Sequence, residues 1–327
     1  MKKFLLNIGL FAVVIAIVAV AGDYVISSGL RKTTIRKFAV WNDIYNGNNL
    51  DNDLVIIGAS SCWAHYNPII LDSILGISSY NLGIDGHSWN PCQPLRYNTY
   101  VRYAKRKPRY VLVNIDMGTF GSMGNNAPYE REQFFPYFWQ DDSLITAIQD
   151  FKEISFTDRY CPVWRYIGYR TLIEQGVTSF FGKKHFIDDG VYKGHRGNTY
   201  LWDRASLNTM DSITIGYEPF VVDSMLSFIA QRKAEGQVVA LVKTPIYHEL
   251  QDRFTNYSEM CARYDSIAQV AGVELINYWN HPIVQDSTFF CNSTHLNKQG
   301  ANVISIQLAH DLDSLGILDL DSLGVIQ

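Results

Sequence analysis

A short apolar run that ends in a glycine and two serines constrains the fold of this chain more than any other stretch. Leu54 to Ile57 is uninterrupted by charge and rich in β-branched residues, which is typical of a parallel strand buried on both faces. Gly58 and Ala59 then allow a tight turn, and Ser60 follows it. Open α/β sheets place their chemistry at the carboxyl ends of such strands. Ser60 is therefore a candidate nucleophile, and the alternative is a plain turn whose serine caps the next helix.

Strand-like and helix-like stretches alternate along much of the chain. Asn67-Pro68 is expected to open a helix that Gly76 closes. Further strands are expected at 78–82, 110–115, 238–242 and 273–276, and further helices at 94–105, 219–234, 257–271 and around 308–315. This β-α-β alternation predicts a three-layer α/β/α sandwich built on a parallel sheet.

The alternation fails between about residues 118 and 212, where aromatic residues are frequent. We interpret this stretch as an insertion. Insertions on the carboxyl side of an α/β sheet commonly form lids or substrate walls, and aromatic faces suit sugar rings. The alternative is a helical subdomain with an aromatic core of its own.

A second polar stretch, Asn292-Ser293-Thr294-His295, precedes the last apolar helix. A lone histidine is more often structural than catalytic, but His295 stands in a polar turn. A serine hydroxyl is a weak nucleophile at neutral pH unless a base accepts its proton. His295 is therefore the candidate base for Ser60.

These blocks together resemble those of the SGNH, or GDSL-like, hydrolase superfamily. Gly58-Ala59-Ser60 is similar to the family's Gly-Asp-Ser, with Ala59 in place of Asp, and 80–86 is similar to the second block, with Gly83 as its glycine. His295 corresponds to the final histidine, and Asn292 stands where the family has aspartate. The family's third block, Gly-x-Asn-Asp, has only a loose counterpart around Asn114 and Asp116.

The resemblance implies a flavodoxin-like SGNH domain over 53–327 in which Ser60 is acylated. The backbone N–H groups of Ser60 and Gly83 would form the oxyanion hole. Because the amide of Asn292 carries no charge, either another carboxylate assists His295 or the activity is weak. The candidate acids or substrate-binding residues are Asp85, Asp116, His248 and Asp286.

The amino-terminal stretch from Phe4 to Ala21 is almost wholly apolar and follows two lysines. Its 18 residues are just long enough to span a bilayer core. We expect an uncleaved transmembrane anchor over residues 1–30, a polar connector over 31–52 and an extracytoplasmic domain. A cleaved signal peptide is the rival interpretation, because Ala19-Val20-Ala21 has the pattern of a cleavage site, and a buried core helix is the third.

Composition excludes some classes of function. The net charge of −4 and the absence of basic blocks with interleaved aromatics argue against nucleic-acid binding. The five cysteines include no C-x-x-C pair, so we expect no zinc site, and no cofactor is expected. Cys62, Cys92 and Cys291 each lie beside a predicted site block, where a disulfide or free thiols are both compatible with the sequence.

The anchor, the aromatic insertion and the Ser60/His295 pair resemble extracytoplasmic proteins that acylate cell-surface polymers. That resemblance implies O-acylation or deacylation of a cell-surface or exported glycan. The implied partners are the glycan acceptor, the membrane itself and an integral membrane O-acyltransferase. A catalytically weak or inactive glycan-binding or scaffolding protein of the same fold is the alternative.

Overall fold

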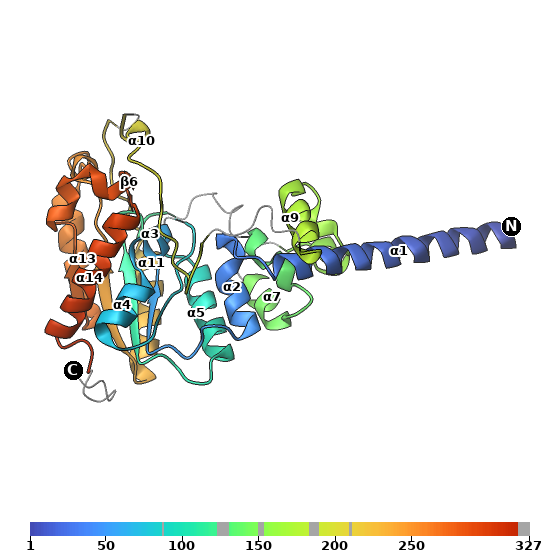
Figure 1. Ribbon diagram of the computed structural model, residues 1–327, viewed down its shortest axis with the longest axis horizontal. Helices are drawn as coiled ribbons and strands as arrows, with labels where there is room; N and C mark the ends of the chain where they lie inside the picture. The colour runs from blue at the N-terminus through green and yellow to red at the C-terminus, as the bar shows by residue number, and fades with distance from the viewer. Residues whose placement is uncertain (87, 123–130, 150–153, 183–189, 209–210, 320–327) are drawn as a thin grey trace. The chain divides into compact units, whose positions relative to one another are not determined.

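The computed structural model describes residues 1–86, 88–122, 131–149, 154–182, 190–208 and 211–319 (Figure 1). The chain forms two compact units. One comprises Met1–Asn42 and Ala127–Asp189, and the other comprises Asp43–Asn126 and Gly190–Gln327. We call them the N-terminal unit and the α/β unit.

The α/β unit contains a five-stranded parallel sheet. Its strands are β1 (Leu54–Ile57), β2 (Ser79–Asn81), β3 (Tyr110–Ile115), β4 (Val238–Lys243) and β5 (Glu274–Asn277). The order across the sheet is β2-β1-β3-β4-β5, and each neighbouring pair is parallel. β1 lies inside the sheet with all four residues buried, as its apolar sequence predicts. The predicted parallel α/β fold is confirmed.

Helices cover both faces of this sheet (Figure 1). α14 (Lys298–Ser314) packs against α3 (Ser60–His65) and α4 (Pro68–Leu75). α11 (Pro219–Ala234) packs against α13 (Tyr257–Ala271), and its Phe228 meets Tyr97 of α5 (Cys92–Tyr103) edge to face. Right-handed β-α-β crossovers in this strand order place the two groups on opposite faces. The sheet is therefore the middle layer of three.

Local sequence explains where these helices begin and end. The Asn67 side chain accepts a hydrogen bond from the backbone N–H of Ile69, and Pro68 occupies the first turn of α4. Gly76 ends α4 in the left-handed conformation, and Gly272 ends α13 in the same way. The shorter elements of this unit are α10 (Ala205–Asn208), α12 (His248–Gln251), η3 (Pro282–Gln285), η4 (Ser287–Phe289), β6 (Phe290–Asn292) and β7 (His295–Leu296).

The N-terminal unit is helical. Its longest helix, α1 (Lys2–Leu30), is long and apolar enough to cross a membrane, a property that signal sequences share. α2 (Arg36–Asn46) begins in this unit. The remaining described helices are η1 (Glu132–Tyr137), α7 (Asp142–Gln149), α8 (Phe156–Tyr160), η2 (Trp164–Tyr166) and α9 (Arg170–Phe180).

Helices occupy parts of both the expected connector over 31–52 and the predicted insertion over about 118–212. Residues 31–52 include α2, whose Phe38 and Trp41 are fully buried. Within the predicted insertion, η1 and α9 pack against α1, and the segment Ala127–Asp189 is grouped with Met1–Asn42 in one compact unit, whereas the segment from Gly190 belongs to the α/β unit. Phe135 and Tyr166, two aromatic residues of the predicted insertion, are buried against each other in the core of the N-terminal unit.

Candidate active site

Ser60 is the first residue of α3, just beyond the carboxyl end of β1. The turn between them depends on Gly58, because a Cβ at this position would lie 2.8 Å from Cβ of Asn114. Real Cβ atoms do not approach other carbon atoms so closely. The glycine thus lets β1 and β3 pack tightly, and the chain then delivers Ser60 to the carboxyl edge of the sheet.

His295 is carried by a small antiparallel hairpin that the sequence did not predict. β6 and β7 pair Asn292 with His295. The side-chain oxygen of Asn292 accepts hydrogen bonds from the backbone N–H groups of Thr294 (3.0 Å) and His295 (2.9 Å). An asparagine that bonds its own backbone in this way stabilises a tight turn. Asn292 therefore shapes the turn as well as touching the imidazole.

The structure brings Ser60, His295 and Asn292 together. Nε2 of His295 lies 2.9 Å from Oγ of Ser60. Nδ1 of the same ring lies 3.2 Å from Oδ1 of Asn292 and 3.0 Å from Oγ1 of Thr294. In the tautomer with the hydrogen on Nδ1, the Nδ1–H group donates a hydrogen bond to Asn292. Nε2 then has a free lone pair that accepts a hydrogen bond from the Ser60 hydroxyl. This is the geometry of a nucleophile, its base and a group that orients the base.

The three aspartates named from sequence bind other groups. Asp85 accepts a hydrogen bond from Nε1 of Trp63 (2.9 Å), and Asp116 accepts one from Oγ of Ser61 (2.7 Å). Asp286 caps η4 by accepting from the backbone N–H of Thr288 (2.9 Å), and the hydrogen bonds with Thr288 lower the pKa of its carboxyl group.

Gly83 lies close to α3, but its N–H has a partner. A Cβ at position 83 would lie 2.6 Å from the backbone nitrogen of Trp63, so only glycine fits. The N–H of Gly83 donates to Oδ1 of Asn81 at 3.0 Å. The sequence predicts that the Gly83 N–H points into the oxyanion hole, whereas in the structure it bonds Asn81. Nδ2 of Asn114 donates to Oγ of Ser61 at 2.8 Å.

Two residues of α3 that sequence reasoning missed contact the site. The indole ring of Trp63 stacks on the imidazole of His295 with 6.4 Å between centroids and 26° between planes. His65 is fully buried, and its Nε2 accepts a hydrogen bond from the backbone N–H of Leu296 at 3.0 Å. Trp63 and His65 follow Ser60 by three and five residues. This spacing would have indicated that they lie near Ser60 only if a helix starting at Ser60 had been expected.

His65 is held as a neutral ring. Nδ1 lies 2.5 Å from Oγ1 of Thr244, which follows β4, and Nε2 is an acceptor. Burial, with a smaller contribution from nearby His295, lowers the pKa of His65 well below its ordinary value. A neutral His65 places no positive charge beside the base.

His248 begins α12, and its ring packs against Tyr247 with 4.6 Å between centroids. Its Nδ1 is 3.8 Å from a carboxylate oxygen of Asp252 in the next helical turn. The neighbouring Tyr247 reaches the turn before His295, because its N–H donates to the carbonyl of Ser293 at 3.0 Å. The ring of Trp202 packs on Tyr247 at 4.6 Å.

All five cysteines are free thiols, and the Sγ of Cys62 donates to Oδ1 of Asn81 at 3.2 Å. Burial raises the pKa of Cys62 well above its ordinary value, so this thiol stays protonated and is a poor nucleophile. Among the described residues, no group of three or more His, Cys, Asp or Glu side chains is placed to hold a metal.

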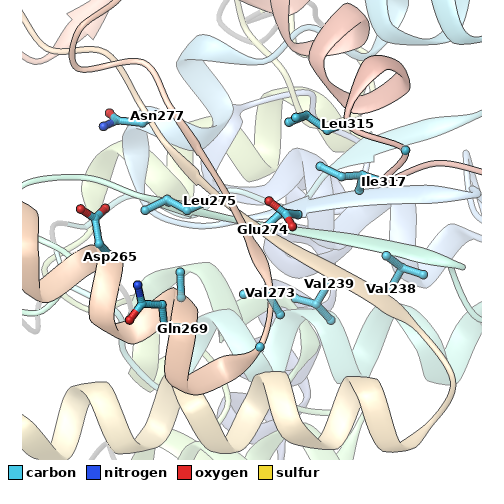
Figure 2. A pocket seen from close by; sticks show the side chains of 13 residues that line it. Val238, Val239, Asp265, Gln269, Val273, Glu274, Leu275, Asn277, Leu315 and Ile317 are labelled. Carbon is cyan, nitrogen blue, oxygen red and sulfur yellow. The ribbon is translucent and has the colours of Figure 1, made fainter.

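A cavity of about 730 Å³ lies away from this site, along the edge strand β5 and the start of β4 (Figure 2). Figure 2 shows Glu274 and Leu275 of β5 with Asp265 and Gln269 of α13 around it. β3 and β4 separate β5 from β1 in the sheet. The cavity is therefore not part of the Ser60 site.

The comparisons with known proteins match this chain to solved structures. The sequence matches no protein-family model and no curated protein. Among solved structures, the chain is similar to a family two carbohydrate esterase from Clostridium thermocellum in complex with cellohexaose, with 10% identity, a TM-score of 0.41 and coverage of 82% of this chain. The chain spans 66% of the length of that esterase. It is also similar to a proposed acylhydrolase from Bacteroides fragilis, with 12% identity, a TM-score of 0.38 and coverage of 80% of this chain and 86% of the other.

The fold and the site define a parallel α/β/α protein with a Ser–His pair beyond the carboxyl end of an internal strand.

Proposed function

We propose that the protein is an SGNH-type serine enzyme that transfers acyl groups to or from a glycan. The observation that carries the proposal is the distance of 2.9 Å between Oγ of Ser60 and Nε2 of His295. A base within hydrogen-bond distance is what turns a serine hydroxyl into a nucleophile.

The chemistry follows from that pair. Oγ of Ser60 attacks the carbonyl carbon of an acyl ester while its proton passes to Nε2 of His295. The tetrahedral intermediate then collapses, the bond to the leaving alcohol breaks, and the alcohol takes the proton from His295. Water completes hydrolysis of the acyl-Ser60 ester, whereas a sugar hydroxyl completes transfer.

A glycan is the proposed acceptor because a partly exposed aromatic ring lies near the pair. Trp63, which stacks on His295, is buried. The partly exposed ring of Trp202, in contrast, packs on Tyr247, whose backbone N–H bonds the carbonyl of Ser293 in the turn before His295. Aromatic faces with polar edges bind sugar rings through their apolar surfaces.

We further propose that α1 is retained as a membrane anchor and that the α/β unit works outside the cytoplasm on a cell-surface or exported glycan. An integral membrane O-acyltransferase would then supply the acyl group. The support for the anchor is the length and apolar character of α1, together with its unbroken continuation to Leu30.

A second candidate function is glycan binding without efficient catalysis. Asn292 favours it, because the residue next to Nδ1 of His295 is an uncharged amide. A carboxylate at that place would stabilise the imidazolium that forms during attack, and an amide does so only weakly.

The test uses the full chain in detergent or nanodiscs with p-nitrophenyl acetate and an acetylated oligosaccharide. We expect Ser60→Ala and His295→Ala to reduce release of acetate to background. Ser73→Ala removes an exposed hydroxyl on α4 and should leave the rate unchanged. If the wild-type protein binds the oligosaccharide but releases acetate no faster than Ser60→Ala, the result would support a binding protein and reject the enzyme.

A further inference from the structure

Within the N-terminal unit, the first polar turn of α1 after its apolar stretch is joined to η2 by a buried ion pair. The guanidinium of Arg165 in η2 lies 2.5 Å from the carboxylate of Asp23, and both side chains are only 1% exposed. Asp23 also accepts from the backbone N–H of Val163 (2.8 Å) and from Oγ of Ser27 (3.1 Å). Losing one partner of a buried pair is strongly destabilising. η2 is thus held against α1 at the position of Asp23.

The carboxyl end of α9 also packs against α1 close to Asp23. A Cβ on Gly29 would lie 1.7 Å from the carbonyl oxygen of Gly176, so the backbones of α1 and α9 are in direct contact (Figure 1). Further along α9, the ring of Phe180 meets Tyr24 of α1 at 6.1 Å. Because Gly176 lies near Gly29 and Phe180 near Tyr24, α9 runs antiparallel to α1. Its carboxyl end points toward the apolar stretch.

The sequence of α1 defines where a bilayer would end. Phe4 to Ala21 would span about 27 Å of hydrocarbon at roughly 1.5 Å per residue. Gly22 and Asp23 then lie at the boundary with the headgroups. A Cβ on Gly22 would be 3.4 Å from Cγ2 of Val163, so η2 stands beside this boundary.

Large apolar side chains are exposed at this level of the N-terminal unit. Trp164 of η2 is 50% exposed, and Phe181 at the end of α9 is 67% exposed. Tyr24 of α1 is also exposed, as are Ile167, which follows η2, and Phe156 and Tyr160 of α8, the helix that precedes η2 and packs against it. Tryptophan and tyrosine concentrate where membrane and water meet, because each has an apolar body and a polar edge. Exposed apolar groups of this size usually mark a contact surface.

We propose that these six residues form a seat on which the N-terminal unit rests in the headgroup layer of the membrane that α1 crosses. The lipid surface is the occupant because the anchor leaves the bilayer beside them. The proposal rests on retention of α1 as an anchor, and it does not depend on the chemistry at Ser60. The seat would make the junction between the anchor and the folded unit rigid, since the Asp23–Arg165 pair lies directly behind it.

The test is tryptophan fluorescence of the full chain in nanodiscs whose lipids carry bromine on the upper acyl carbons. Brominated lipids quench tryptophans that touch them. We expect brominated lipids to quench part of the tryptophan fluorescence of the wild-type protein. In Trp164→Phe, most of this lipid-dependent quenching should disappear. Trp202→Phe, which removes a tryptophan of the α/β unit, should retain it.

A gain of signal provides a second variant. Adding Ile167→Trp to Trp164→Phe places a new indole in the seat and should restore quenching by the brominated lipids. Unchanged quenching in Trp164→Phe, together with quenching of Trp164 by aqueous iodide, would overturn the seat while leaving the anchor intact. Recovery of a trimmed protein in the soluble fraction would overturn both the anchor and the seat.

Discussion

The backbone N–H of Leu296 donates a hydrogen bond to Nε2 of His65, 3.0 Å away. The residue that follows His295 is therefore tied to the helix that begins with Ser60. Nδ1 of His65 bonds the side chain of Thr244, which directly follows β4. His65 thus joins three elements whose positions set the distance between Ser60 and His295.

We predict that His65 is a positioning residue. His65→Ala should lower kcat on p-nitrophenyl acetate by roughly 10- to 100-fold with a smaller change in KM, because small displacements of a reacting pair are costly. His65→Gln keeps one acceptor and one donor and should recover part of the rate. His310→Ala, on the exposed side of α14, is the control. Equal rates for wild-type protein and His65→Ala would reject this role.

Stability should fall in mild acid because of His195. Burial lowers the pKa of His195 to about 4, whereas the ordinary value is 6.5. Below pH 6.5 the unfolded chain takes up a proton that the folded protein refuses, so the contribution to stability is complete above pH 6.5 and is lost as the pH falls toward 4. The full loss in the free energy of unfolding is about 3.5 kcal/mol, from a pKa difference of about 2.5 at about 1.4 kcal/mol per pKa unit.

The measurement is Tm of the full chain between pH 7.5 and 5. His195→Gln removes this titration and should give a flatter curve, although burial of His65 contributes in the same direction. A curve for His195→Gln as steep as that of the wild-type protein would contradict the assignment.

Asn292→Asp should raise esterase activity by about tenfold or more, because a charged partner stabilises the imidazolium. The carboxylate would also raise the pKa of His295, so the acid limb of the rate profile should move to higher pH. Asp286→Ala should leave the rate unchanged, since Asp286 caps η4. If Asp286→Ala abolishes activity and Asn292→Asp has no effect, Asp286 and not residue 292 supplies the acid.

The crossing of α1 and α9 should tolerate no side chain at Gly29. Gly29→Ala forces the helices apart and should destabilise the N-terminal unit by about 2 kcal/mol or more. Tryptic cleavage after the buried Arg165 would report the opening. Gly9→Ala is the matched control, because no atom lies within 4 Å of a Cβ there. Equal cleavage rates in the two variants would contradict a tight crossing.

Much of the α/β unit was predictable because its signals are local. Asn67-Pro68 and Gly76 predict the ends of α4, and both were found. The strand from Leu54 to Ile57 is apolar at every position, which identifies a buried parallel strand without reference to its partners.

The unpredicted features depend on contacts between distant segments. The β6–β7 hairpin is only a few residues long and is stabilised by Asn292, whose side chain bonds backbone groups in the turn. His65 reaches Leu296 across 231 positions of sequence. The packing of α9 and η2 against α1 includes the Asp23–Arg165 pair, whose members are 142 positions apart. No local pattern encodes such pairs.

The most direct test of the account is the site and rate of reaction with a fluorophosphonate, which bonds covalently to activated serines. Peptide mapping of the full-length wild-type protein should place the adduct on Ser60. His295→Ala should slow its formation to background, while His310→Ala reacts normally. An adduct on another residue, or equal labelling of wild-type protein and His295→Ala, would show that His295 does not activate Ser60 and would contradict the proposed acyl transfer.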